Sequence, residues 1–137
     1  MNPGRAPMAF DMYQEVILQH YRAPKNFGPL DGANRSGEES NPLCGDHITV
    51  RLQVNESTRR IEDVRFEGDG CAISVAASSM LTERVKGISL DEAARLDRDS
   101  VLQLLGIPLS PARVKCALTG FVAFGRALHP GQPIATE

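Results

Sequence analysis

The feature that most constrains the fold is a run of eight residues in which apolar and polar side chains alternate without exception. In HITVRLQV, residues 47–54, every second residue is apolar: Ile48, Val50, Leu52 and Val54. A period of two places alternate side chains on opposite faces of a strand, so the run predicts a half-buried β-strand. A polar connection, residues 55–59, leads to a second alternating run, IEDVRFEG (61–68). The two runs together predict an antiparallel hairpin with one buried face.

Helical patterns lie on both sides of this hairpin. FDMYQEVILQHY (10–21) carries an apolar stripe at residues 10, 13, 17 and 21 and is followed by Pro24, which predicts a first helix. VAASSMLTERVK (75–86) predicts a second helix, and Gly87 is the residue expected to end it in a left-handed conformation. The run of small residues at 76–79 predicts close packing against another element.

Capping signals place two further helices near the C-terminal end. Ser89 and Glu92 have the spacing of a capping box, and Gly106 would close the helical stretch VLQLL. Ser110 is an expected N-cap, followed by a proline at the first helical position. The apolar stripe of this last helix is formed by Val114, Leu118, Phe121 and Leu128.

Two connecting segments complete the predicted order of elements. Residues 22–42 are rich in Gly, Pro, Asn and Ser and predict a long loop, while Cys71–Ser74 is short and predicts a third strand. The sequence therefore predicts an α+β fold: a small three-stranded antiparallel sheet packed against several helices, with an N-terminal helix first and a long C-terminal helix last.

Composition narrows the class of protein. With 137 residues, 42% of them hydrophobic, the chain is the size of a single domain (1–137), in which we expect residues 1–8 to be disordered. The formal net charge of −2 and the scattered lysines and arginines indicate neither nucleic acid nor an anionic membrane as a partner. The sequence contains no apolar run long enough to span a bilayer and no secretory h-region, so we expect a cytoplasmic location.

The three cysteines, Cys44, Cys71 and Cys116, are odd in number and far apart, which argues against a disulfide framework and for free thiols or thiolate ligands. Any one of them alone is most often a small buried hydrophobe. In NPLCGD (41–46), however, Cys44 and Asp46 would share one face of an extended chain. Three thiolates and one carboxylate would supply four ligands for zinc or iron. Arg113 and Lys115 lie within a helical turn of Cys116 and favour its thiolate.

Three motifs carry a resemblance to a known family: NPLCGD (41–46), EGDGCAIS (67–74) and ARVKCAL (112–118). In this order, between about Tyr13 and Leu128, they resemble the U-type iron-sulfur cluster assembly scaffolds, the IscU/SufU family, which also forms the N-terminal module of NifU. The resemblance implies a non-enzymatic scaffold that accepts sulfur from a cysteine desulfurase and combines it with Fe2+ into a transient [2Fe-2S] cluster. The cluster would then pass to recipient apo-iron-sulfur proteins.

The resemblance also implies the site. Cys44, Asp46, Cys71 and Cys116 would bind the cluster and could hold Zn2+ instead. Because Arg113 and Lys115 favour the thiolate of Cys116, we expect Cys116 to be the persulfide acceptor.

Two departures leave the branch of the family open. The IscU branch has a histidine before the third cysteine, where this chain has Lys115, and ARVKCA is similar to the SufU branch. The interval between the last two cysteines, 116 − 71 = 45 residues, leaves no room for the insertion of SufU-type members. Two alternatives therefore stand beside the scaffold: a zinc-dependent sulfur acceptor with sulfurtransferase activity, and a stable zinc-bound interaction module.

Overall fold

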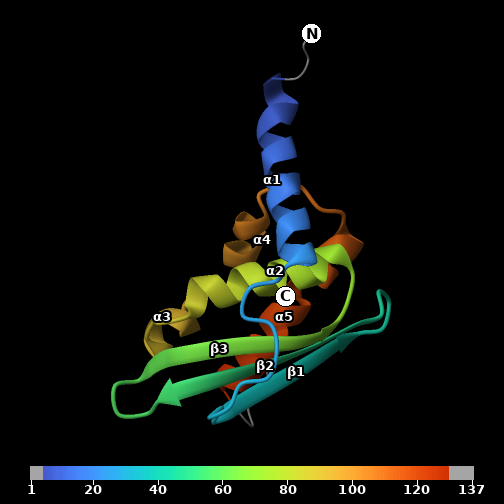
Figure 1. Cartoon of the computed structure of the whole chain (residues 1–137). Helices are drawn as coiled ribbons and strands as arrows, with labels where there is room; N and C mark the ends of the chain where they lie inside the picture. Colours follow the sequence, from blue (N-terminus) through green and yellow to red (C-terminus); the bar gives the residue numbers. More distant parts are fainter. Residues whose placement is uncertain (1–4, 130–137) are drawn as a thin grey trace.

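The computed structural model describes the backbone of residues 5–129 and the side chains of residues 14–129. Its elements, in chain order, are α1 (Arg5–Arg22), β1 (Arg35–Asn41), β2 (Asp46–Asn55), β3 (Arg60–Asp69), α2 (Ala72–Val85), α3 (Leu90–Ala94), α4 (Arg98–Leu105) and α5 (Pro111–Leu128). The α+β prediction is confirmed, with a helix first and a long helix last. Figure 1 shows the sheet as one layer, with α2 and α5 lying along one of its faces.

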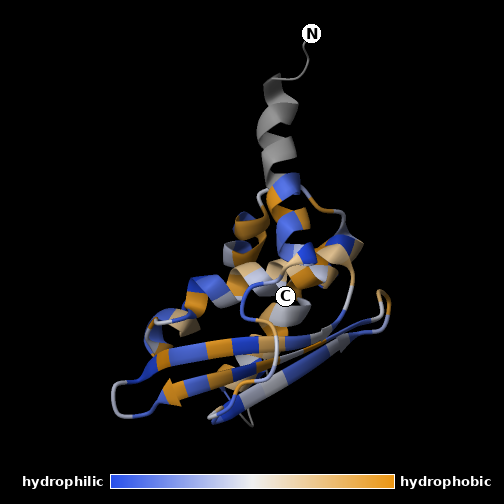
Figure 2. Ribbon diagram, in the orientation of Figure 1, coloured by the Kyte–Doolittle hydropathy of each residue, from blue (hydrophilic) through white to orange (hydrophobic). Residues whose placement is uncertain are grey.

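The sheet is antiparallel, and its strand order is β1-β2-β3. The predicted hairpin of β2 and β3 is confirmed, with a register shift between Gln53 and Val54. All four apolar residues of the alternating run in β2 are buried, and the same alternation is visible as orange and blue bands along the strands in Figure 2. The buried face packs against α5 at β1 and β2, and against α2 at β3.

The predicted position of the third strand is wrong. Cys71 is the N-cap residue of α2, and Ala72–Ser74 form the first turn of that helix. The third strand is instead β1, whose sequence RSGEESN lies in the segment predicted to be a loop. β1 contains no large apolar residue because α5 lies directly against it: a Cβ at Gly37 would be 2.4 Å from the carbonyl oxygen of Ala123. Hydrophobic alternation therefore could not reveal this strand.

The predicted helix boundaries hold where a cap defines them. Gly87 and Gly106 follow α2 and α4 with φ of 91° and 72°, the left-handed conformation that glycine adopts without a steric cost. The side chains of Ser89 and Ser110 accept hydrogen bonds from the backbone N–H groups three residues later. Close packing of the small residues in α2 is also confirmed, because a Cβ at Gly120 of α5 would be 2.1 Å from Ser78 Oγ.

The first helix is longer than predicted. α1 begins at Arg5, so residues 5–8 of the segment expected to be disordered lie in a helix, while residues 1–4 are outside the described residues. Of the predicted apolar stripe, Ile17 is buried and Tyr21 is 45% exposed; the side chains at positions 10 and 13 are outside the described residues. A hydrogen bond of 2.6 Å between His20 Nδ1 and Ser79 Oγ joins α1 to α2.

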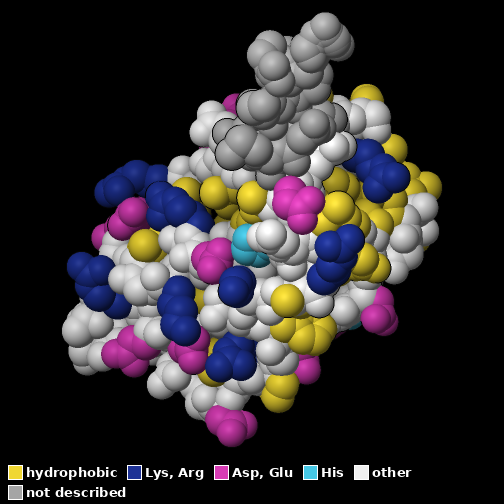
Figure 3. Space-filling model, turned by 45° about the horizontal axis from the view of Figure 1, so that its top comes forward, with side chains coloured by type: hydrophobic (Ala, Val, Ile, Leu, Met, Phe, Trp, Pro, Cys, Tyr) yellow, Lys and Arg dark blue, Asp and Glu magenta, His cyan; other side chains and the backbone are white. Residues whose placement is uncertain are grey.

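Charged side chains are spread over the surface. On the face in Figure 3, lysine and arginine side chains are interspersed with acidic ones and do not gather into one patch. None of the described helices is long and apolar enough to cross a membrane.

Candidate metal centre

The first two predicted ligands lie where β1 turns into β2. The last residue of β1, Asn41, pairs with the first residue of β2, Asp46. The backbone N–H of Cys44 donates to the carbonyl oxygen of Asn41 over 3.1 Å, which closes the turn. Gly45 has φ of 72°, a conformation that a side chain would strain. The turn therefore brings the Cys44 thiol and the Asp46 carboxylate to the same side of the chain.

The third ligand comes from α5. Cys116 lies in the second turn of this helix and is fully buried. One ligand atom from each of Cys44, Asp46 and Cys116 lies within 4.8 Å of the other two. The fold thus brings together side chains that are as much as 72 residues apart in the sequence.

Asp46 has a buried carboxylate that a purely apolar core would not accommodate. Its side chain is only 2% exposed, Oδ1 accepts a hydrogen bond of 3.0 Å from the backbone N–H of Cys71, and Oδ2 is buried without a hydrogen-bond partner. Among the described residues, no lysine, arginine or histidine forms an ion pair with it. A buried carboxylate oxygen beside two sulfurs is unfavourable unless a cation or a proton satisfies it, so this donor set fits a metal.

Gly70 makes room for this carboxylate. A Cβ at position 70 would lie 2.9 Å from Asp46 Oδ1 and 2.1 Å from Ser74 Oγ. Gly70 of the EGDGCAIS motif therefore serves the site through close approach of the backbone.

Cys71, the fourth predicted ligand, is adjacent to the site, but its sulfur is not part of the converged group. Its backbone N–H contacts Asp46, whereas its sulfur lies more than 4.8 Å from at least one of the three grouped ligand atoms. The residue is the N-cap of α2, with φ of −72° and ψ of 169°, and its side chain makes no capping hydrogen bond. The thiol is half-buried and free.

The fold brings the sulfurs of Cys44 and Cys116 together, with their Cα atoms 6.8 Å apart. The sequence alone did not reveal this pairing because only the fold places the two sulfurs side by side. The same convergence is required of two thiolate ligands of one metal.

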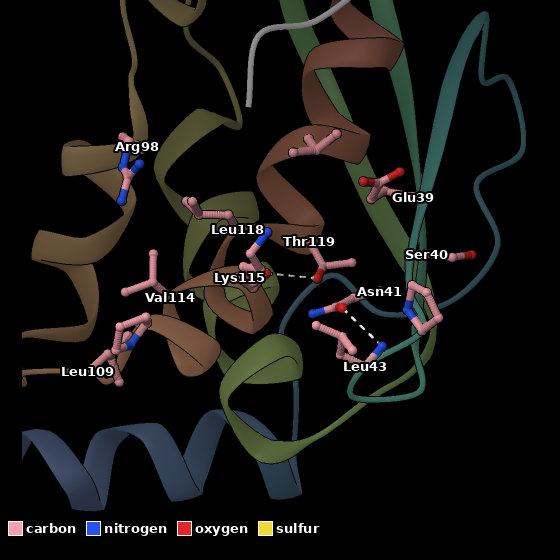
Figure 4. A pocket seen from close by; sticks show the side chains of 13 residues that line it. Glu39, Ser40, Asn41, Leu43, Arg98, Leu109, Val114, Lys115, Leu118 and Thr119 are labelled. Carbon is pink, nitrogen blue, oxygen red and sulfur yellow. Dashed lines mark hydrogen bonds between the residues drawn. The ribbon is translucent and has the colours of Figure 1, made fainter. Parts of the chain in front are cut away.

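Arg113 and Lys115 are both exposed on the first turns of α5 and make no ion pair with a described acidic residue. Lys115 lines an open groove of about 650 Å3 beside the cysteines. Figure 4 shows this groove between α5, the end of β1 and Arg98 of α4. Lys115 is therefore positioned to act on groups that approach the site through this groove.

One site residue was not singled out from the sequence. The side chain of Asn41 donates through Nδ2 to the sulfur of Cys116, over 3.9 Å, and accepts through Oδ1 from the backbone N–H of Leu43, over 3.3 Å. The available signal was the Asn-Pro pair that opens NPLCGD, because asparagine commonly accepts a hydrogen bond from the backbone two residues later.

Comparisons with known proteins identify relatives of this chain. An iron-sulfur cluster assembly scaffold protein IscU of Aquifex aeolicus is 41% identical over 113 residues, which are 82% of this chain and 71% of that protein. A zinc-dependent sulfurtransferase SufU of Bacillus subtilis is 31% identical over 85% of this chain and 89% of its own length. The crystal structure of a SufU protein of Fervidobacterium islandicum superposes with a TM-score of 0.71 at 28% identity, covering 83% of this chain and 94% of that one.

The family model of the NifU-like N-terminal domain matches residues 12–130, which include the whole converged site. The chain therefore belongs to the family of NifU-like N-terminal domains.

Proposed function

We propose that this protein is an iron-sulfur cluster assembly scaffold. In this proposal it accepts sulfur from a cysteine desulfurase, combines it with ferrous iron into a transient [2Fe-2S] cluster on Cys44, Asp46, Cys71 and Cys116, and passes the cluster to recipient apo-proteins. The observation that carries the proposal is the buried Asp46 oxygen without a partner, beside the sulfurs of Cys44 and Cys116. Membership of a family whose relatives include named cluster scaffolds supports it.

The ligand set suits a cargo that must later leave. Cys44 and Cys116 would become ligands once their thiols have been deprotonated. Cys71 would complete the set by turning its thiol toward Asp46, whose carboxylate its backbone already contacts. Because iron-sulfur clusters are normally held by thiolates, the harder carboxylate of Asp46 would be the weakest of the four ligands.

Sulfur would enter at Cys116. The thiolate of Cys116 would attack the terminal sulfur of the desulfurase persulfide, so that the new persulfide forms on Cys116 and the desulfurase cysteine leaves as a thiolate. Cys116 is fully buried, and Leu43, on the turn that covers it, is 81% exposed. Delivery therefore requires the turn at residues 42–45 to move away from α5, while Arg113 and Lys115 would favour the attacking thiolate.

Anaerobic reconstitution tests the proposal. The reduced protein should develop protein-bound visible absorption when given Fe2+ and sulfide, with two irons per site. Alanine at Cys44, Cys71 or Cys116 should abolish this absorption, whereas alanine at the exposed Leu43 should not. A parent protein that remains colourless, with its thiols shown to be reduced, would contradict the scaffold function.

A second candidate, zinc-dependent sulfur transfer, is favoured by two observations: the likeness to the sulfurtransferase of Bacillus subtilis, and Lys115 in place of a histidine ligand. Here Zn2+ would be held by the same residues and the protein would accept persulfide without building a cluster. Zinc-loaded protein should then accelerate a cysteine desulfurase, and metal-free protein should not. A zinc-bound module with no effect on the desulfurase would be a stable interaction domain. The cytoplasmic location stays a prediction of the sequence.

A further inference from the structure

Asn41 connects both cysteines of the converged group. Its carbonyl oxygen accepts the backbone N–H of Cys44 over 3.1 Å, and its side-chain Nδ2 donates to the sulfur of Cys116 over 3.9 Å. Its side-chain Oδ1 accepts the backbone N–H of Leu43 over 3.3 Å. One half-buried residue at the end of β1 therefore makes hydrogen bonds to the turn that carries one ligand and to the sulfur of the other.

The oxygen and the nitrogen of the Asn41 carboxamide have different hydrogen-bonding roles. The oxygen can only accept, and Leu43 uses it to fix the turn; the nitrogen can only donate, and this fixed orientation directs it at the sulfur. A thiolate or a metal-bound sulfur is a better acceptor than a neutral thiol because the bond is then charge-assisted. Among the described side chains, no other donates a hydrogen bond to a sulfur of the site.

We propose that Asn41 is a positioning residue that donates a hydrogen bond to the sulfur of Cys116 and so strengthens metal binding at the Cys44–Asp46–Cys116 group. The inference rests on the proposed function in that the same sulfurs hold the cargo. The inference adds Asn41 as a hydrogen-bond partner outside the ligand set. Asn41 would withdraw charge from the sulfur of Cys116 and connect this sulfur to the turn that carries Cys44.

Two variants separate the hydrogen bond to sulfur from the turn. Asn41→Ser keeps a short side-chain acceptor for the N–H of Leu43 but places no donor within reach of Cys116. Asn41→Ala removes both contacts. The matched control is Asn55→Ser at the opposite end of β2, where Asn55 Oδ1 fixes a turn by accepting from the N–H groups of Ser57 and Thr58 over 3.0 and 3.1 Å.

Cobalt absorption of the reduced full-length protein is the first measurement. Withdrawal of charge from a sulfur raises the energy of sulfur-to-cobalt charge transfer, so Asn41→Ser and Asn41→Ala should both move this band to longer wavelength. Both should also weaken cobalt affinity by about tenfold, the lower end of the range for the loss of an outer-sphere partner. Asn55→Ser should leave the band and the affinity unchanged. A spectrum of Asn41→Ser identical to that of the parent would overturn the proposal, because a role limited to the turn predicts that result.

Nuclear magnetic resonance of the reduced, metal-free protein gives a second, independent readout. The carboxamide proton signals of Asn41 should shift when Cys116 is replaced by alanine, and those of Asn55 should not. Unchanged Asn41 signals would refute the contact. If the Asn41 variants show the expected cobalt effects but the parent protein forms no cluster, the scaffold function is refuted and the role of Asn41 is upheld. If the parent protein forms a cluster but its cobalt spectrum is identical to that of Asn41→Ser, the role of Asn41 is refuted and the scaffold function is upheld.

Discussion

Replacing Asp46 by asparagine should destabilise the metal-bound protein without destabilising the metal-free protein. Asparagine has the same shape as aspartate and keeps an oxygen that can accept the N–H of Cys71. It lacks the negative charge of the Asp46 carboxylate, which belongs to a residue only 2% exposed and has one oxygen without a hydrogen-bond partner. In the metal-free protein the substitution removes an unfavourable buried charge. In the metal-bound protein it removes a charged ligand.

The magnitudes follow from these contacts. Leaving a buried polar group unsatisfied costs about 1–3 kcal/mol when it is neutral and more when it is charged, and the substitution replaces the charged, unpartnered Oδ2 by a neutral amide nitrogen. A hydrogen bond to a neutral acceptor is worth about 1 kcal/mol less than one to a charged acceptor. The free energy of unfolding of metal-free Asp46→Asn should therefore equal that of the parent or exceed it by up to about 2 kcal/mol. With zinc at about 1,000 times the parent's Kd, the parent gains about 4.1 kcal/mol, whereas a variant that binds about a hundredfold more weakly gains only about 1.4 kcal/mol.

Denaturant unfolding under reducing conditions, in chelator and in excess zinc, measures both values. The variant should be at least as stable as the parent in chelator and less stable than the parent in zinc. Asp69→Asn is the matched control, because Asp69 is an exposed carboxylate at the end of β3 and its loss should change stability by no more than about 0.5 kcal/mol in either condition. If Asp46→Asn is less stable than the parent in chelator by more than about 1 kcal/mol, the carboxylate is structurally satisfied and the argument from its burial fails.

Four further predictions concern the cargo, the sulfur, the metal and the acid response. Asp46→Ala should slow cluster transfer and lengthen the lifetime of the visible absorption; transfer at the parent rate would show that Asp46 is not the labile ligand. After incubation with a cysteine desulfurase, mass mapping should find persulfide on Cys116, and label confined to the other two cysteines would contradict its role. Chelation should increase hydrogen exchange around the site while the core keeps its protection; loss of protection over the whole chain would show that the metal holds the fold together. Hydrogen bonds from the backbone and side chain of Ser100 lower the pKa of Asp97, the N-cap of α4, below its ordinary value of 3.8. Its stabilising effect is therefore present above that value and lost as the pH falls through the lowered pKa, so Asp97→Ala should unfold at lower denaturant than the parent at neutral pH and together with it in strong acid.

Elements with strong local signals could be predicted from the sequence. The alternation in β2 corresponds to burial of the same four residues, and glycine or serine caps located the ends of α2 and α4 and the starts of α3 and α5. β1 could not be predicted because its pairing depends on the backbone of β2 and on α5 packing against Gly37. β1 is an edge strand covered by α5, and its sequence has no alternation of apolar and polar residues that would predict a strand.

Three of the four predicted ligands converge in the fold, but their geometry could not be predicted from the sequence. Motif order pointed to Cys44, Asp46 and Cys116, which the fold brings together. The sequence predicted a strand at Cys71, whereas this residue caps α2, so its backbone rather than its sulfur reaches Asp46. The contact of Asn41 with Cys116 joins residues 75 positions apart and has no signal in either segment alone.

The burial of the predicted ligands indicates which part of the site would move when the proposed cargo enters or leaves. Cys116 lies on α5, a helix that packs on β1, β2 and α2, and Asp46 is fixed by the N–H of Cys71 at the start of α2. Cys44 instead lies in a turn next to Leu43, which is 81% exposed, and Asn41 holds this turn through hydrogen bonds with the backbone N–H groups of Cys44 and Leu43 and with the sulfur of Cys116. Opening the turn breaks local hydrogen bonds without disturbing the apolar core, so it costs far less than moving a helix. In the proposed scaffold, the turn that carries Cys44 would therefore open to admit or release the cargo while the backbones of Cys116 and Asp46 keep their places, and the bond to Asp46 would still be the weakest of the four.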